Sequence, residues 1–366
     1  MLEAVLKILI AYGSKGKFFH MKEFANSLER LGVQCELVKD TDYSRGFPSK
    51  NPRDWFCGSS KLKKLLKNTK PDVVFIDRQS HFGLNVLKAK IPLFVLLRGH
   101  YWSEIEFAKK TLYHGALMRL VLWFRNRIAE KIFGGATVVL PICRYLESVV
   151  KQHHPRQTTA VFFEGINSSH WHHTESMKLK HPCVGLLQDA NWWGKTKEML
   201  ILKKVLEAMH DVNFYWAGDG PFRDQIVAEL GKFDNFKWLG RLDYPDKVRE
   251  YLGEIDVYAL ISGMDLAPLT LKEAQLMEKP VVATNVGGIP EMMQDKKTGF
   301  LVNEGDHQDL IEKLSTLISD KNMADKMGKN GRKFVEETFS WDIIARDFLD
   351  VVKLNMHKDR KSQIPK

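Results

Sequence analysis

The sequence predicts an α/β protein made of two doubly wound domains, and three observations lead to this prediction. The chain has 366 residues, enough for two domains of ordinary size. Short apolar runs alternate with amphipathic, helix-like stretches along both halves, a pattern typical of mainly parallel sheets covered by helices. Hydrophobic residues make up 44% of the chain and charged residues 27%, a composition that excludes a disordered protein.

The first half contains six apolar runs that are typical of strands. They are Val5–Tyr12, Val33–Val38, Pro71–Ile76, Pro92–Leu97, Ala136–Pro141 and Thr159–Phe163. A helix-like stretch over His20–Leu31 ends at Gly32, a residue that favours a helix C-terminus. We therefore expect an N-terminal domain over residues 1–168.

The second half repeats this alternation. Its strand-like runs are Cys183–Leu187, Asn213–Ala217, Phe236–Leu239, Asp256–Ile261 and Pro280–Thr284, and its helix-like stretches include Lys197–Met209 and Asn322–Leu354. Most of these strands end in glycine or polar residues, where open α/β sheets bind ligands. We expect a polar, His-rich linker over 169–182, a C-terminal domain over 183–338, and a last helix with a frayed tail over 339–366.

The cysteines and the apolar runs restrict the class of protein. Cys35, Cys57, Cys143 and Cys183 are scattered without paired spacing, which argues against a disulfide framework or a thiolate zinc site. No apolar run approaches the ~20 residues of a membrane-spanning helix. Lys7 interrupts the first apolar run, which is more typical of a strand than of a signal peptide. We therefore expect a cytoplasmic protein, at most peripheral on the inner face of the cell membrane.

The positive charge is concentrated in the first half. Residues 1–178 carry 28 Lys and Arg against 15 Asp and Glu, whereas residues 179–366 carry 27 against 30. This asymmetry favours an anionic partner for the first half, such as a membrane surface or a phosphorylated acceptor. A charge that serves solubility alone is the alternative interpretation. We expect no nucleic-acid partner, because no recognisable binding module accompanies the charge.

One stretch of the first half combines this charge with apolar side chains. Residues 105–133 interleave Lys and Arg with Leu, Trp and Phe, a pattern typical of a helix on an anionic membrane. A core helix with a charged outer face is the alternative interpretation.

The residues most informative about chemistry lie between Ser262 and Glu291. Asp265 precedes an expected helix that starts near Pro268, and Glu273 follows eight residues after Asp265. Free amides at such a helix N-terminus are a natural place for a pyrophosphate. The two carboxylates could then contact different parts of one ligand, such as the ribose and the sugar of a nucleotide-sugar.

The neighbouring motifs resemble the retaining GT-B glycosyltransferases of group 1 (family 4). The resemblance lies in Ala217-Gly218-Asp219-Gly220-Pro221, Asp256-Val257-Tyr258-Ala259-Leu260, Glu273-Ala274, Gly287-Gly288-Ile289-Pro290-Glu291 and Thr298-Gly299-Phe300-Leu301-Val302. It continues to Phe339-Ser340-Trp341-Asp342 and covers about the last half of the chain. It implies two Rossmann-like domains facing a central cleft, with a C-terminal helix that crosses back to the N-terminal domain.

The resemblance also implies roles for individual residues of the second half. Glu273 would bind the donor ribose, and Asp265, which replaces the usual Glu, would act at the sugar as a catalytic residue. The family's Arg after the first strand of this half is replaced by Leu186, so Lys195, with Lys197 second, would bind the diphosphate. The remaining donor-binding candidates of this half are Gly218, in a glycine loop, and the residues around the start of the helix expected near Pro268, namely Leu266, Ala267, Pro268 and Leu269. Gly16, in a glycine loop of the first half, is a further donor-binding candidate.

The first half matches the family less well. His100 would lie at the reaction centre as a catalytic residue, although Arg98 could occupy the same place. Glu164 replaces the Asn of the family's N-G-V-D element. The acceptor would be a glycan or a lipid-linked molecule, and the nucleotide-sugar would be a substrate, not a cofactor.

No metal is expected, because the sequence has no D-x-D element in a suitable loop. His170, His172 and His173 do not have the spacing of a zinc site. Two other functions stay open at this point, a sugar-nucleotide epimerase of the same fold and a non-catalytic nucleotide-sugar binding protein.

Overall fold

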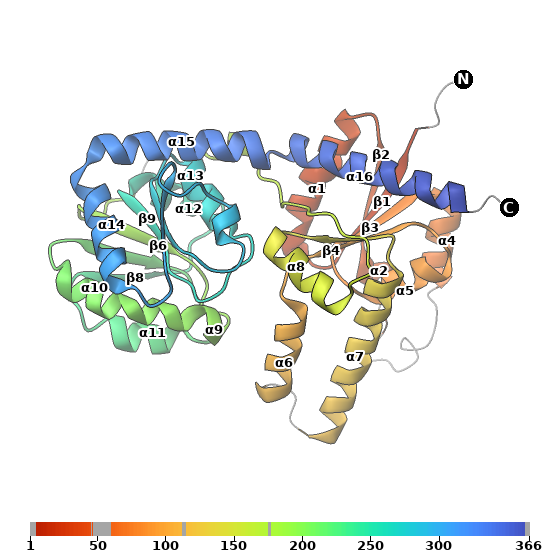
Figure 1. Cartoon of the computed structure of the whole chain (residues 1–366), viewed down its shortest axis with the longest axis horizontal. Helices are drawn as coiled ribbons and strands as arrows, with labels where there is room; N and C mark the ends of the chain where they lie inside the picture. The colour runs from red at the N-terminus through yellow and green to blue at the C-terminus, as the bar shows by residue number, and fades with distance from the viewer. Residues whose placement is uncertain (1–4, 45, 47–59, 112–114, 175–176, 363–366) are drawn as a thin grey trace. The chain divides into compact units, whose positions relative to one another are not determined.

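The computed structural model describes residues 5–44, 46, 60–111, 115–174 and 177–362 (Figure 1). Its contacts divide the chain into two units. Unit 1 consists of Met1–Gly165 with Trp341–Lys366, and unit 2 consists of Ile166–Ser340. The stretch 169–182, which we expected as a linker, counts with unit 2 in this division.

Unit 1 contains a parallel sheet of five strands in the order β2-β1-β3-β4-β5. The strands are β1 (Lys7–Tyr12), β2 (Gln34–Lys39), β3 (Val73–Ile76), β4 (Leu93–Leu97) and β5 (Val138–Pro141). β3, β4 and β5 are buried along their whole length, as expected for strands of Val, Ile, Leu and Phe covered on both faces. β2 has exposed and half-buried residues, with Val38 alone buried, because it forms an edge of the sheet.

Helices cover this sheet on both sides (Figure 1). They are α1 (Lys15–Arg30), α2 (Asp40–Tyr43), α4 (Ser60–Thr69), α5 (His81–Lys88), α6 (Tyr101–Thr111), α7 (Ala116–Gly135), α8 (Arg144–His153) and α16 (Trp341–Ser362). The C-terminal helix α16 packs on α1, where the ring centroids of Phe24 and Phe348 lie 5.3 Å apart. The indole of Trp341 donates a hydrogen bond to Glu23 at 3.0 Å. The expected return of the last helix to the N-terminal domain is therefore confirmed.

Unit 2 contains a parallel sheet of six strands in the order β11-β10-β9-β6-β7-β8. The strands are β6 (Cys183–Leu187), β7 (Asn213–Ala217), β8 (Phe236–Gly240), β9 (Val257–Leu260), β10 (Val281–Thr284) and β11 (Gly299–Val302). Its α-helices are α9 (Trp193–Thr196), α10 (Leu202–Ala208), α11 (Arg223–Leu230), α12 (Asp246–Glu254), α13 (Leu269–Leu276), α14 (His307–Ser319) and α15 (Lys321–Phe339). Short 3-10 turns cover Ser168–His170 (η1), Lys197–Ile201 (η2) and Ile289–Glu291 (η3).

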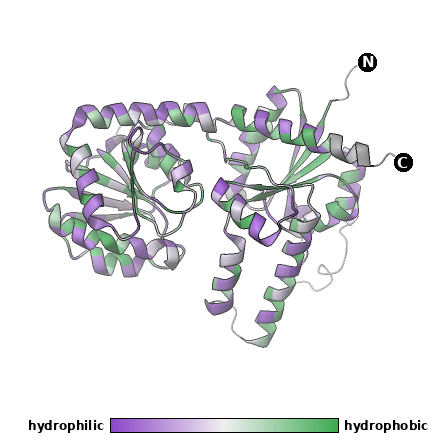
Figure 2. Cartoon of the chain, viewed as in Figure 1, coloured by the Kyte–Doolittle hydropathy of each residue, from purple (hydrophilic) through white to green (hydrophobic). Residues whose placement is uncertain are grey.

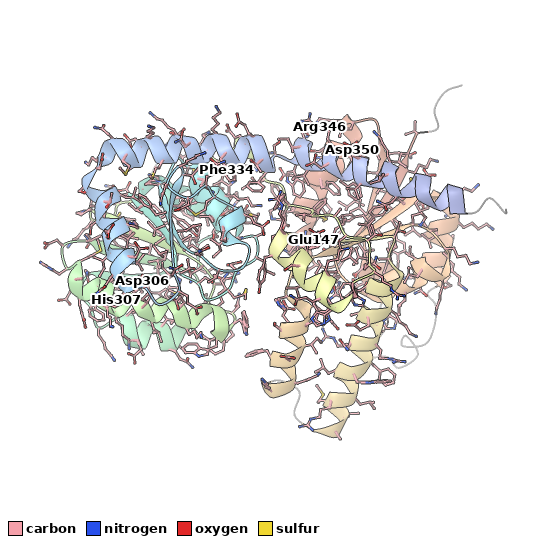
Figure 3. The ribbon with its side chains drawn as sticks, viewed as in Figure 1. Glu147, Asp306, His307, Phe334, Arg346 and Asp350 are labelled. Atoms are coloured by element: carbon pink, nitrogen blue, oxygen red, sulfur yellow. The ribbon has the colours of Figure 1, made fainter. Side chains whose placement is uncertain are left out.

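Hydrophobic residues follow the strands of both sheets, and hydrophilic residues dominate the outer faces of the helices (Figure 2). In unit 2 the core joins β-strand residues such as Phe214 and Trp216 to Leu310 and Leu314 of α14. Asp306, labelled in Figure 3, caps α14 by accepting a hydrogen bond from the Asp309 amide at 3.0 Å.

Three sequence expectations need correction. The run Thr159–Phe163 is no strand, because it makes one isolated bridge, Val139 to Thr159, along the edge of β5. The expected helix over 322–354 is two helices, α15 and α16, separated by Ser340 in an extended conformation. The expected helix over 197–209 begins as the 3-10 turn η2 and becomes α-helical only at Leu202.

The order of the strands identifies one switch point in each sheet. In unit 1 the switch point lies between β1 and β3, because the connection after β1 runs to one side of the sheet (β2) and the later strands lie on the other side. In unit 2 it lies between β6 and β9, because β7 and β8 lie on one side of β6 and β9 to β11 on the other. Ligands of open α/β sheets bind outside the carboxyl ends of the strands at such points. None of the helices in the described part of the chain is long and apolar enough to cross a membrane.

Candidate functional site

The switch point of unit 2 brings together two of the residues selected from the sequence. α9 follows β6 and carries Lys195, while the loop after β9 carries Asp265. The Lys195 ammonium forms an ion pair with Oδ2 of Asp265, and the two side chains are 25% and 15% exposed. The Gly263 amide donates to the Lys195 carbonyl at 3.0 Å, which holds the two loops together.

The backbone fixes Asp265 on its other side. The Asp265 carbonyl accepts a hydrogen bond from the Gly288 amide at 2.9 Å. Gly287 adopts a φ of +55°, and a Cβ added there would lie 2.2 Å from the same carbonyl. A glycine is therefore required at position 287 for the loop after β10 to approach Asp265.

Fewer backbone N–H groups are available to a ligand before α13 than we expected from the sequence. α13 begins at Leu269, so Pro268 is its N-cap residue and has no N–H to donate. The Leu266 amide donates to Oδ1 of its neighbour Asp265 at 2.9 Å. Of the four residues 266–269, this leaves Ala267 and Leu269 as the ones whose N–H groups could serve a ligand, beside the first N–H groups of the helix itself.

Glu273 lies in the middle of α13 and is only 2% exposed. Burial raises the pKa of its carboxyl to about 7, although a hydrogen bond from Tyr244 and the charge of Lys272 act in the opposite direction. The helix is fixed to β6 by Tyr258, whose hydroxyl contacts the Leu187 carbonyl at 3.2 Å and Thr270 at 2.8 Å.

Two further candidates from the sequence, Gly218 and Lys197, have different environments in unit 2. Gly218 has a φ of +153°, and a Cβ there would lie 2.1 Å from the Gln188 carbonyl. Gly218 therefore allows the loop after β7 to pack against the loop after β6. Lys197 is exposed at the start of η2, and the ion pair with Asp265 is made by Lys195.

The switch point of unit 1 holds a buried network of charges. Arg98, directly after β4, donates to Glu164 at 3.0 Å and to Asp77 at 3.4 Å. Its side chain is 15% exposed, and both carboxylates are 4% exposed. Burial alone would raise the pKa of Glu164, but the charges of Arg98, Lys17 and His20 outweigh it and lower this pKa to about 2.

Two polar atoms of this region are buried without a hydrogen-bond partner, Oδ1 of Asp77 and Nδ1 of His20. Burial raises the pKa of Asp77, against a hydrogen bond from the Gly13 amide and the charge of Arg98. Burial lowers the pKa of His20, against the attraction of Glu164. Buried polar atoms without a partner are unusual, so these two atoms are candidates for contact with an ordered water or a ligand at this edge of the sheet.

His100 and Gly16 also lie at this edge of unit 1. His100 directly precedes α6, and its Nδ1 accepts a hydrogen bond from the Ser103 amide at 3.3 Å. Gly16 is the second residue of α1, and a Cβ there would meet nothing within 4 Å. Gly13 is the sterically constrained glycine of this loop, because its Cβ would lie 2.3 Å from Nε of Arg78.

Sequence reasoning missed four residues of these two regions: His20, Asp77, Glu164 as a partner of Arg98, and Tyr244. Asp77 had a usable signal, because it directly follows the apolar run of β3. The replacement of Asn by Glu164 was visible, but its pairing with Arg98 spans 66 residues and needs the fold.

The described residues contain one group with the spacing of metal ligands, and it lies elsewhere. His181, Cys183 and Asp256 meet at the start of β6, the end of the strand opposite to the switch-point loops. His181 Nδ1 and Asp256 lie 2.8 Å apart, so the group already makes its own hydrogen bond. His170, His172 and His173 are not part of it.

Comparison with known proteins identifies the family to which most of unit 2 is similar. Residues 196–334 match the family of glycosyl transferases group 1. Unit 2 contains a group 1 glycosyltransferase domain. The resemblance to group 1 glycosyltransferases is therefore confirmed over residues 196–334, a stretch that begins one residue after Lys195 and contains Asp265.

The curated relatives are similar over short segments. The sulfoquinovosyl transferase SQD2 of Arabidopsis thaliana is 32% identical over 152 residues, which cover 41% of this chain and 29% of the relative. The capsular polysaccharide biosynthesis glycosyltransferase CapM of Staphylococcus aureus is 44% identical over 72 residues, or 20% and 19% of the two chains. The matched segments thus span less than a third of these relatives.

Solved structures match almost the whole chain in fold. Sucrose-phosphate synthase from Thermosynechococcus elongatus has a TM-score of 0.72 at 15% identity, covering 96% of this chain and 100% of the other. HepE of Anabaena in complex with UDP and glucose has a TM-score of 0.67 at 18% identity, covering 95% and 99%. The two Rossmann-like units predicted from the sequence are confirmed by this likeness.

Proposed function

We propose that this chain is a glycosyltransferase that moves a sugar from a nucleotide-sugar to an acceptor hydroxyl with retention of anomeric configuration. The observation that carries the proposal is the Lys195–Asp265 pair at the switch point of unit 2. Asp265 lies within the group 1 match, eight residues before Glu273, and Lys195 directly precedes that match. A cation for the diphosphate and a carboxylate for the sugar are the groups that such a donor requires.

In the proposed site, groups of the bound donor would replace each partner of the Lys195–Asp265 ion pair. Without donor, Lys195 and Asp265 neutralise each other. The donor diphosphate would replace the carboxylate as the partner of Lys195, and the sugar hydroxyls would replace the ammonium as donors to Asp265. Ala267, Leu269 and the first amides of α13 would add to the positive potential at the diphosphate.

Glu273 would receive the ribose hydroxyls. In the ligand-free protein its carboxyl accepts a hydrogen bond from Tyr244, whose side chain is otherwise half exposed. A ribose hydroxyl would take over this hydrogen bond and so displace the Tyr244 hydroxyl. Because ribose donates to the ionised carboxylate, binding should release a proton when the pH is below about 7.

The transfer itself would depend on positioning and on neutralising the leaving diphosphate, and no metal is proposed for this step. The acceptor hydroxyl would attack from the face from which the nucleotide departs. His100 is proposed as the group of unit 1 that contacts the reacting sugar, because Arg98 is held by two buried carboxylates.

The acceptor is proposed to be a lipid-linked or cell-surface glycan, reached from the cytoplasmic face of the membrane. The support is the excess of positive charge in residues 1–178, 28 Lys and Arg against 15 Asp and Glu. UDP-sugars are the first donors to test, because HepE, which shares the fold, binds UDP and glucose.

The test is thermal unfolding against a panel of UDP-, GDP- and ADP-sugars. A ligand at ~100 times its dissociation constant should stabilise the wild type by about 2.7 kcal/mol. Glu273→Ala should lose this stabilisation, while Glu312→Ala, at an exposed position of α14, should keep it. A wild type that no nucleotide-sugar stabilises at millimolar concentration contradicts the proposal. Nucleotide release without a transferred sugar contradicts the transferase assignment.

A further inference from the structure

Helix α7 has an ordinary buried face. Leu122, Ala129, Ile132 and Phe133 are buried along one side of the helix. Tyr101 of α6 contacts this side through the Phe133 ring, 5.5 Å away, and through a hydrogen bond to Asn126 at 3.2 Å. The first half of α7 extends beyond the sheet of unit 1 together with α6 (Figure 1).

The opposite face of α7 is also apolar, and it is exposed. Leu117 is 72% exposed and Trp123 is 52% exposed, with Leu120 and Phe124 beside them. At 100° per residue these four positions lie on the side of the helix away from Leu122 and Ala129. A surface helix normally carries polar residues there, so this apolar stripe (Leu117, Leu120, Trp123 and Phe124) is an exposed apolar patch of the kind that marks an interaction surface.

The charges around the apolar stripe have one sign. Arg119, Arg125 and Arg127 alternate with it, and residues 115–129 contain no Asp or Glu. The guanidinium of Arg127 lies over the Trp123 ring, 5.2 Å from its centroid. Trp and Arg beside exposed Leu and Phe form the pattern of a helix in a lipid interface, where acyl chains take the apolar residues and headgroups take the cations.

We propose that the apolar stripe of α7 docks unit 1 on an anionic lipid surface. The link between this docking surface and a membrane-held acceptor rests on the proposed function. A second copy of this chain is a poorer occupant, because a symmetric contact through this stripe would bring arginines of the two copies together.

The test is co-sedimentation of the full chain with vesicles of phosphatidylcholine alone or containing about one third phosphatidylglycerol. The wild type should bind the anionic vesicles, and binding should weaken with salt. The double variant Leu120→Glu/Trp123→Glu should lose at least about tenfold in binding, since it removes apolar area and adds negative charge. The control Leu354→Glu, at an exposed position of α16, should stay within about twofold.

Three results would overturn the inference. These are absence of wild-type binding to anionic vesicles, equal binding of the double variant, and a dimer in solution that the double variant abolishes. The melting temperature shift with a nucleotide-sugar separates the two proposals. A wild type that shows the donor shift but does not bind anionic vesicles refutes the docking surface alone, whereas a wild type that binds these vesicles but shows no donor shift refutes the transferase.

Discussion

Each of the two switch points of this protein pairs a cation with carboxylates, but the two ion-pair networks differ in burial and in the number of carboxylates. In unit 2, Lys195 and Asp265 form one partly exposed ion pair that a ligand could exchange. In unit 1, Arg98 is enclosed by Asp77 and Glu164, both almost fully buried. The group 1 family match covers the first of these regions and not the second. A shared fold therefore places polar groups at the same edge of each sheet, while neighbouring residues decide how deeply these groups are buried and how they are paired.

Two glutamates make the comparison quantitative. Glu164 and Glu273 are both buried, yet the pKa of Glu164 is lowered to about 2 and that of Glu273 is raised to about 7. The difference lies in the cations. Glu164 faces Arg98, Lys17 and His20, whereas the Lys272 ammonium beside Glu273 lies over the Phe339 ring, 4.6 Å from its centroid.

The largest expected effect is on stability, from Arg98→Ala. Removing the guanidinium leaves Asp77 and Glu164 buried without their cation, so the free energy of unfolding should fall by about 3–5 kcal/mol. Chemical denaturation of the purified variant measures this. Arg241→Ala is the matched control, since its exposed pair with Asp189 at 3.8 Å should contribute less than about 1 kcal/mol. Equal small effects of both variants would mean that the network of unit 1 is not structural.

Titration of Glu273 should give the next largest effect. Its folded pKa of about 7 lies above the ordinary value of 4.5. The protonated carboxyl therefore stabilises the fold fully below about pH 4.5, and this contribution is lost as the pH rises through 7. The difference corresponds to about 3 kcal/mol. Glu273→Gln removes the titration, so the variant should gain stability relative to the wild type between pH 5 and pH 8. A pH-independent difference between the two proteins contradicts the raised pKa.

The affinity for the donor should distinguish Lys195 from Lys197, the two lysines proposed for the diphosphate. Lys195→Met removes a charge-assisted contact to the diphosphate and should weaken nucleotide-sugar binding by about 10- to 100-fold, from about 1.5–3 kcal/mol per such contact. Lys197→Met, on the exposed turn η2, should change binding by less than about threefold. Isothermal titration with the donor found in the thermal panel measures both. The reverse order would move the diphosphate to Lys197.

A pair of glycines gives the smallest effects, with opposite signs. Gly218→Ala places a Cβ 2.1 Å from the Gln188 carbonyl at a φ of +153°, so it should cost about 1–3 kcal/mol of stability. Gly16→Ala introduces a Cβ into open space within helix α1 and should be neutral or stabilise by up to about 1 kcal/mol. Thermal unfolding of both variants checks the signs. A stabilising Gly218→Ala is incompatible with the tight loop packing described for unit 2.

The sequence predicted the strands better than the contacts between them. The apolar runs Cys183–Leu187 and Asn213–Ala217 match β6 and β7 residue for residue, because buried parallel strands are nearly continuous hydrophobic stretches. The run Thr159–Phe163 failed because it follows the edge of β5 with only one bridge. The break at Ser340 escaped detection, since both flanking helices keep a helical pattern.

The candidate site could be predicted by residue type but not by partner. Lys195, Asp265 and Glu273 were selected from motifs, whereas the Lys195–Asp265 ion pair joins residues 70 positions apart and depends on which strands lie side by side. The environment of α7 could not be predicted from the sequence for a different reason. Its residues fit both a core helix and a membrane helix, and the structure gives it one buried and one exposed apolar side. Cys57 lies outside the described residues.

Hydrogen–deuterium exchange with and without a nucleotide-sugar is the most direct test of the central claim, that unit 2 holds the donor at its switch point. Donor binding at this switch point should give the largest protection in residues 191–195, 263–273 and 287–288, the segments that carry Lys195, Asp265, Glu273 and the Gly287–Gly288 turn. Protection confined to unit 1 around Asp77, Arg98 and α1, at a concentration that saturates the thermal shift, would contradict it.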